Sequence, residues 1–136
     1  MLDLPPCAYE ISEYYQVPIE LIAGVRLQEA GKLGQRNGPR FNGSYDIGPM
    51  QINTWWFKKH DGRLQKFGIT EKSVQFNYCQ NVAAGTWILK QELDRYKDLD
   101  KALSAYNSGK PKENGYSEKV RRKINDLIDP TFNYSP

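Results

Sequence analysis

The sequence predicts a mainly α-helical protein that forms a single compact domain over residues 1–136, built around one long central helix with a small irregular or β-containing insertion. The chain of 136 residues is long enough for one domain with a buried core. Apolar residues recur at steps of three and four through most of it, and one stretch rich in Gly, Asn and Pro interrupts them. Hydrophobic residues make up 39% and charged residues 26%, which excludes a disordered tail, and the apolar runs are too short for a transmembrane helix.

Spacing and proline mark the first two helices. The segment Ala8–Tyr15 carries apolar residues on one helical face. Pro18 fits the first turn of the next helix, because its missing N–H costs nothing there, and we expect this helix to run to about Ala30 and to end at Gly31. Residues 32–44 read KLGQRNGPRFNGS, which predicts a loop with short strands toward residue 53.

The longest helix is predicted in the second half of the chain. Trp55 and Trp56 open a short helix, and Thr70 begins a cap region ahead of the long one. The face of the long helix is formed by Tyr78, Val82, Gly85, Leu89, Leu93 and Tyr96. Two more helices are expected, one over residues 99–106 and a last one with Tyr116, Val120, Ile124 and Leu127 on its buried face.

Glu29 is an acid on an apolar helix face. At 100° per residue it lies close to the directions of Ile22 and Val25. Desolvation and the negative end of the helix dipole both disfavour its carboxylate, so we expect a raised pKa and a role as a general acid. The alternative is that the helix frays and Glu29 reaches water.

The only cysteines are Cys7 and Cys79. With no CxxC pair and a single histidine, His60, the sequence predicts no metal site and no cofactor. The two cysteines either form a disulfide, which would indicate an oxidising compartment, or stay as buried free thiols.

Several short motifs follow Glu29 in a fixed order. Ile-Gly-Pro-Met-Gln-Ile-Asn occupies residues 47–53, Ala-Tyr-Asn occupies residues 105–107, and Gly-Tyr ends at Tyr116. Together they resemble the family 1 lytic transglycosylases, or SLT domains, of the lysozyme-like superfamily. Within that family the likeness is to the small specialised enzymes of the IagB group, which accompany secretion and conjugation machines.

This resemblance implies an α+β lysozyme-like fold whose insertion lines the active-site cleft, with Glu29 as the catalytic acid. It assigns substrate binding to Met50, Gln51, Tyr106, Asn107 and Tyr116, although ordinary core packing is an equal alternative for Met50 and Tyr106. It also implies a disulfide between Cys7 and Cys79 and a place in the periplasm or cell envelope, the export signal being absent from this sequence. Ala30 and Pro49 stand where the family usually has serine and leucine, and these departures bear on the expected substrate affinity more than on the expected reaction.

The implied reaction is cleavage between N-acetylmuramic acid and N-acetylglucosamine without water, leaving a 1,6-anhydromuramoyl end. Its expected partners are peptidoglycan strands and components of a type IV or type III secretion machine. One rival is a hydrolase resembling goose-type lysozyme, with Asp46 positioning a water, and another is a non-catalytic peptidoglycan-binding module. Asp61 is a further candidate for a second acid, but the polar, turn-rich surroundings of both aspartates favour a solvated or turn-capping role. A net charge of +3 suits an anionic polymer without requiring a nucleic acid, and the basic residues Lys119, Arg121, Arg122 and Lys123 read as a solvated helix face.

Overall fold

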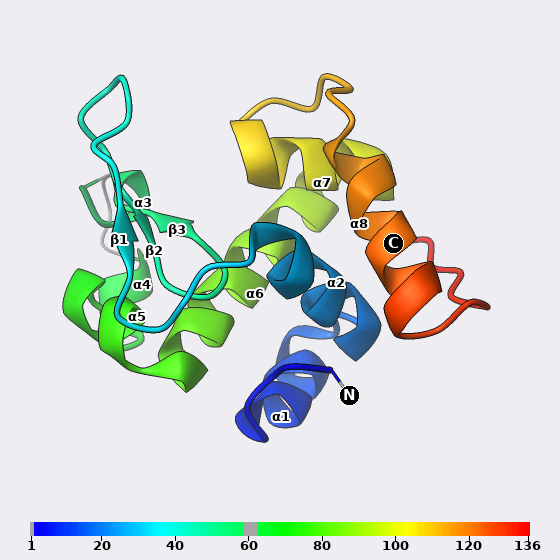
Figure 1. Cartoon of the computed structure of the whole chain (residues 1–136), viewed down its shortest axis with the longest axis horizontal. Helices are drawn as coiled ribbons and strands as arrows, with labels where there is room; N and C mark the ends of the chain where they lie inside the picture. The colour runs from blue at the N-terminus through cyan, green and yellow to red at the C-terminus, as the bar shows by residue number, and fades with distance from the viewer. Residues whose placement is uncertain (1, 59–62) are drawn as a thin grey trace. The chain divides into compact units, whose positions relative to one another are not determined.

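The computed structural model describes residues 2–58 and 63–136 and confirms a mainly α-helical fold (Figure 1). The helices of these residues are α1 (Cys7–Tyr15), α2 (Ile19–Glu29), α3 (Trp55–Lys58), α4 (Arg63–Lys66), α5 (Glu71–Phe76), α6 (Tyr78–Tyr96), α7 (Leu99–Ser108) and α8 (Tyr116–Leu127). The strands are β1 (Arg36–Asn37), β2 (Asp46–Ile47) and β3 (Ile52–Asn53).

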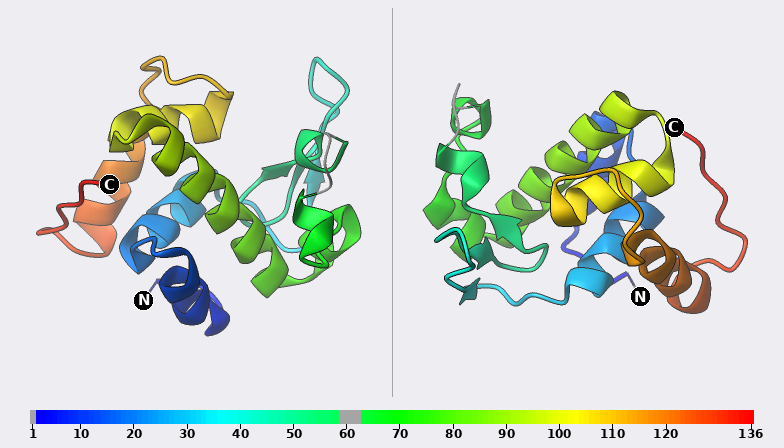
Figure 2. Two further views of the ribbon diagram at one scale, coloured as in Figure 1. Left: turned by 180° about the vertical axis from the view of Figure 1, so that it is seen from behind. Right: turned by 90° about the horizontal axis from the view of Figure 1, so that it is seen from above.

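The chain divides into two compact units. The first holds the residues up to Gln28 together with 86–136, and the second holds residues 29–85. Helix α6 therefore begins in the second unit and ends in the first. Figure 2 shows it as one long continuous helix. The single domain over residues 1–136 stays a prediction.

In the first unit α2 packs closely on α8. The five residues from Leu21 to Val25 are all buried, so α2 is enclosed on every side and not only along one stripe. Gly24 permits this approach, because a Cβ there would lie 2.5 Å from Cγ1 of Ile124. Helix α7 also packs on α8.

The predicted face of the last helix is right for three of its four residues. Tyr116, Val120 and Ile124 are buried, whereas Leu127 is 60% exposed. Leu127 is the last residue of α8, and the backbone leaves helical geometry at Ile128. The apolar spacing therefore continues one turn beyond the buried face.

The second unit contains a small antiparallel sheet in the order β1-β2-β3. Arg36 pairs with Ile47, and Asp46 pairs with Asn53, so β2 lies in the centre. Helix α5 packs on β2. This sheet is the β-containing insertion that the sequence predicts.

Thr70 does cap a helix, but it caps α5 and not the long helix. Its hydroxyl accepts a hydrogen bond from the Ser73 N–H, and the Ser73 hydroxyl lies 2.8 Å from the Thr70 backbone nitrogen, which completes a capping box. Asn77 then adopts an extended conformation, so the helix is interrupted and α6 begins only at Tyr78.

Both cysteines are disulfide-bonded, and since the chain has only two, the bond joins Cys7 to Cys79. The predicted disulfide is confirmed. Among the described residues, no helix has both the length and the apolar character needed to cross a membrane.

Candidate active site

Glu29 is the last residue of α2, and the chain turns sharply after it. Ala30 has a φ of +56°, a left-handed conformation that ends the helix. The Glu29 side chain is half-buried. Its expected raised pKa stays a prediction.

Gly31 ties the end of α2 to the segment 48–51. Its N–H donates to the Pro49 carbonyl over 3.2 Å. A Cβ at Gly31 would lie 1.9 Å from the Gly48 carbonyl oxygen and 2.5 Å from Nε2 of Gln51, so no other residue fits here without moving the backbone. The proposed acid is thus two residues from a fixed backbone contact with the Gly-Pro-Met-Gln motif.

The segment 48–51 is a tight turn closed by Gln51. Both the backbone N–H and the side-chain Nε2 of Gln51 donate to the Gly48 carbonyl, at 3.0 and 2.9 Å. Gly48 has a φ of +70° and Gln51 a φ of +53°, both in the left-handed region. These hydrogen bonds hold the strained turn in one shape.

Asn81 on α6 holds this turn through hydrogen bonds to its backbone. It is fully buried, its Oδ1 accepts the Met50 N–H over 2.8 Å, and its Nδ2 donates to the carbonyls of Ile47 and Val74 at 2.9 and 3.0 Å. Three backbone groups that would otherwise be buried without partners are satisfied by one amide. A Cβ at Gly48 would lie 2.3 Å from this Nδ2, so the turn and the amide fit only with glycine there.

Met50 packs against α6 close to Asn81. Its side chain is fully buried, and a Cβ at Gly85 would lie 2.7 Å from its sulfur. Met50 therefore packs in the core of this unit, and its role in substrate binding stays a prediction.

Gln51 retains capacity for a ligand. It is half-buried, its Oε1 accepts from Nδ2 of Asn37 over 3.0 Å, and its Nε2 uses one of two hydrogens on Gly48. One N–H and one lone pair of the amide are left for substrate. Asn37, an exposed residue of β1, joins the candidate site through this bond.

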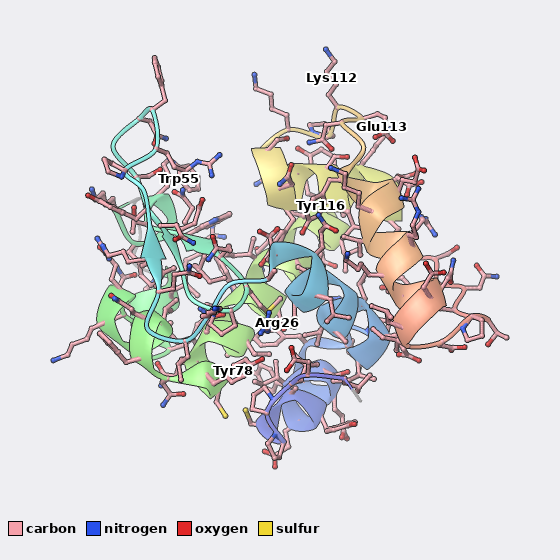
Figure 3. All side chains as sticks on the ribbon, viewed as in Figure 1. Arg26, Trp55, Tyr78, Lys112, Glu113 and Tyr116 are labelled. Atoms are coloured by element: carbon pink, nitrogen blue, oxygen red, sulfur yellow. The ribbon has the colours of Figure 1, made fainter. Side chains whose placement is uncertain are left out.

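Three predicted residues lie in the first unit, where a loop residue links two of them. Asn114 donates from Nδ2 to Oδ1 of Asn107 over 3.0 Å, and its own Oδ1 accepts the Tyr116 N–H over 3.1 Å. Tyr116 lies at the beginning of α8 (Figure 3), and Tyr106 lies half-buried on α7. Asn114 thus ties the Ala-Tyr-Asn motif to the later tyrosine.

Both carboxylate oxygens of Asp46 are engaged by neighbouring side chains. Arg40 pairs with its Oδ2 at 2.5 Å, and Asn53 donates to its Oδ1 over 3.0 Å. The other candidate for a second acid, Asp61, lies outside the described residues.

The structure therefore places Glu29, Met50 and Gln51 in the second unit and Tyr106, Asn107 and Tyr116 in the first. The sequence reading missed Asn81, Gly31, Asn37 and Asn114. An amide within the apolar spacing of α6 is the signal that points to Asn81, since a buried amide needs partners. The polar loop around Asn114 gives no comparable signal.

Comparison with known families identifies the chain. Residues 6–129 match the family described as the transglycosylase SLT domain. The chain belongs to this family. This SLT domain is 31% identical over 119 residues to Invasion protein IagB of Salmonella typhimurium (strain SL1344), covering 87% of this chain and 72% of that protein.

Other relatives are similarly distant. Protein IpgF of Shigella flexneri is 30% identical over 122 residues, 86% of this chain and 78% of that protein. The Peptidoglycan-binding-like protein of Escherichia coli O157:H7 is 30% identical over 110 residues, 76% of this chain and 64% of that protein. SLT domains are lytic transglycosylases, so this SLT domain is a lyase-type enzyme with peptidoglycan as its substrate.

Proposed function

We propose that this SLT domain cleaves the β-1,4 bond between N-acetylmuramic acid and N-acetylglucosamine with Glu29 as both acid and base. Glu29 protonates the glycosidic oxygen, and the bond from that oxygen to C1 breaks. The substrate's own acetamido group stabilises the positive charge at C1. The Glu29 carboxylate then takes the proton of the C6 hydroxyl, whose oxygen bonds to C1 and forms the 1,6-anhydro ring.

The observation that carries this proposal is the fixed junction between the end of α2 and the segment 48–51. A group that first donates and then accepts a proton must stay in place between the two steps. The hydrogen bond from the Gly31 N–H to the Pro49 carbonyl holds one side of that junction. The hydrogen bonds of the Asn81 side chain with the backbone of Met50 and Ile47 hold the other. Gln51 presents the free part of its amide from the same junction.

The environment of Asp46 supports a reaction with one carboxylate. A hydrolase of the goose type would need a second acid to position water. Asp46 is 14% exposed at its side chain and already accepts from Arg40 and Asn53, so it is poorly placed for that work. The anhydro product, which needs no water, fits this arrangement better.

Digestion of purified peptidoglycan followed by mass analysis tests the reaction. We expect products one water lighter than those of a hydrolase, with no new reducing end. Glu29→Gln should abolish cleavage and keep the fold, because the amide preserves shape but cannot give up its proton in the same way. Glu20→Gln, on the first turn of the same helix, is the matched control and should stay active. Normal activity of Glu29→Gln, or hydrated products, would contradict the proposal.

The same proposal places the enzyme in the periplasm or cell envelope, where it opens the wall locally for a secretion, conjugation or pilus apparatus. The disulfide supports an oxidising compartment, and a relative named an invasion protein supports work beside such an apparatus. Cell fractionation checks the compartment. We expect the oxidised chain in the periplasmic fraction, and a reduced chain in the cytoplasm would oppose this part of the proposal.

A further inference from the structure

The loop between β1 and β2 carries a phenylalanine at its end. Residues 40–44, called the hairpin tip below, lie in the second unit, and the side chain of Phe41 is fully exposed there. Figure 1 shows this cyan loop projecting beyond the small sheet, with α5 at the other end of the same unit. Single exposed apolar side chains are common on protein surfaces. Phe41 differs from them in how it is held and in the charge of the unit that carries it.

Hydrogen bonds within the hairpin tip hold its backbone in one conformation. The Arg40 N–H donates to the Ser44 carbonyl over 2.7 Å, and the Gly43 N–H donates to the Arg40 carbonyl over 2.8 Å. Oδ1 of Asn42 accepts the Ser44 N–H over 3.0 Å. A contact made by Phe41 therefore does not have to order the loop first, which removes a cost that flexible loops incur on binding.

A second exposed aromatic side chain stands at the base of the same hairpin. Trp55 is 43% exposed and begins α3 beside the hairpin (Figure 3). Its backbone N–H donates to Oδ1 of Asn53, whose Nδ2 donates to Oγ of Ser44, each over 2.9 Å. These hydrogen bonds connect the beginning of α3 to the hairpin tip. Phenylalanine and tryptophan are side chains that favour the interface of a lipid bilayer.

The net positive charge of the chain lies entirely in the second unit. Residues 29–85 hold eight of the 19 lysines and arginines but only four of the 16 acidic residues, so this unit carries +4 and the rest of the chain carries −1. A unit with this charge is attracted to an anionic surface. At the hairpin tip Arg40 pairs with Asp46, but 59% of its side chain stays exposed, so its guanidinium can still contact phosphate groups.

The composition of the hairpin tip favours a lipid bilayer over a protein as its partner. A specific protein interface takes about 20 to 30 residues on each side and has an apolar core. The hairpin tip offers one apolar side chain between two polar ones, Arg40 and Asn42. A bilayer interface needs no more than this, because the ring enters the apolar region while the polar side chains stay among the headgroups. Peptidoglycan is also anionic, but it has no apolar interior that could bury a phenyl ring.

We infer that the hairpin tip docks this SLT domain reversibly on a bilayer that contains anionic lipids, with Phe41 inserted at the interface. The charge of the second unit draws the protein to the surface, and Phe41 adds an apolar contact. Reversible attachment of this kind combines two weak signals. It would confine cleavage to peptidoglycan that lies near a membrane. The inference does not depend on the reaction proposed for Glu29.

Sedimentation with lipid vesicles tests the inference. We expect the wild type to bind vesicles of phosphatidylglycerol and phosphatidylethanolamine, to bind pure phosphatidylcholine at least fivefold more weakly, and to dissociate in about 1 M salt. Phe41→Ser should lower the partition coefficient on the anionic vesicles roughly tenfold, because it removes the apolar contact. The matched control is Phe76→Ser at the end of α5, which removes another exposed phenylalanine of the same unit and should bind like the wild type.

A fluorescent variant reports the depth of the hairpin tip. Phe41→Trp should keep the binding, and the fluorescence that it adds to that of the wild type should be quenched by lipids brominated on their acyl chains. Absence of this quenching would contradict insertion.

Three other outcomes would overturn the inference. They are a wild type that does not bind the anionic vesicles, equal binding by Phe41→Ser and the wild type, and an equal loss in Phe41→Ser and Phe76→Ser. Cleavage of lipid-free glycan strands should be unchanged in Phe41→Ser, and a loss there would show that Phe41 contacts the glycan instead. If the wild type cleaves no glycan, the proposed function fails while the vesicle experiment still decides the docking.

Discussion

At Gly31 two stretches of backbone approach so closely that a single added carbon has no room. The nearest atom to that carbon would be the Gly48 carbonyl oxygen, at 1.9 Å, which belongs to the backbone and cannot rotate away. The end of α2 and the segment 48–51 therefore fit together only with glycine at this position. Because Glu29 is two residues earlier, its position depends on this contact.

We expect Gly31→Ala to lower the free energy of unfolding by about 3 kcal/mol, since the backbone must shift to accept the methyl group. Cleavage of peptidoglycan should fall in the molecules that remain folded, because the end of α2 moves away from the segment 48–51. Urea denaturation and turnover at a fixed fraction folded measure the two effects.

Gly43→Ala is the control for this variant. Gly43 has a φ of +82° with no atom within 4 Å of an added Cβ, so alanine there brings backbone strain without a clash and should cost about 1 kcal/mol. Its activity should be that of the wild type. Equal stability and activity of the two variants would show that the Gly31 contact is unimportant.

The sequence predicts the position of residues that is set by local spacing along a helix. It does not predict contacts with residues that are distant in the chain. The spacing of the apolar residues in α2 is enough to place Glu29 in its last turn. Asn81 acts through Ile47 and Val74, which reach it only after the sheet and α5 have formed. No local pattern identifies those two carbonyls. Met50 shows the same limit, because its burial against Gly85 follows from packing and not from its motif.

At the scale of elements, the helices were predicted well and their breaks less so. The bounds of α1 and α2 follow from apolar spacing and from proline, and apolar spacing also predicts the existence of α6. The break between α5 and α6 was missed, since Thr70 and the apolar residues after it are compatible with one continuous helix. The extended backbone of Asn77 separates them. Helix α4 has only one turn, which is too short to show the apolar repeat that predicts a helix.

The contact between α7 and α8 depends on a polar group that the apolar spacing does not include. Asp100 on α7 accepts from Nε of Arg121 over 2.8 Å and from the buried Ser117 hydroxyl, both on α8. The hydrogen bond from Arg121, followed by that from Ser117, lowers the pKa of Asp100. Its charged form therefore stabilises the pairing of the two helices.

Asp100→Asn should lower the free energy of unfolding at pH 7 by no more than about 1 kcal/mol, because the carboxylate is largely exposed to solvent. Folding lowers this pKa, so the stabilisation is complete above the ordinary aspartate pKa of about 3.9 and is lost as the pH falls through the lower value of the folded state. Urea midpoints of both proteins at pH 7 and at about pH 2 check this. A gap that persists at the acidic pH would argue against the carboxylate as its cause.

At the scale of the whole molecule, one covalent bond joins residues that are far apart in the sequence. The disulfide between Cys7 and Cys79 links the first helix to the beginning of α6, and the chain between them includes α2, the sheet and three short helices. The number and spacing of the cysteines do not decide between a disulfide and two free thiols. Only the resemblance to SLT domains favours the bond. A cross-link over so long a loop restricts the unfolded chain strongly.

Replacing both cysteines by serine should lower the free energy of unfolding by about 2 to 4 kcal/mol, because the unfolded chain regains the freedom of a loop of roughly 70 residues. A reducing agent should bring the wild type to the same level and leave the Cys7→Ser, Cys79→Ser variant unchanged. Thiol titration of the oxidised, unfolded wild type should find no free thiol. Two free thiols, or a wild type that is indifferent to reduction, would mean that the bond does not form in solution. Since the bond restricts chiefly the unfolded state, the double variant should still cleave peptidoglycan under conditions in which it is folded.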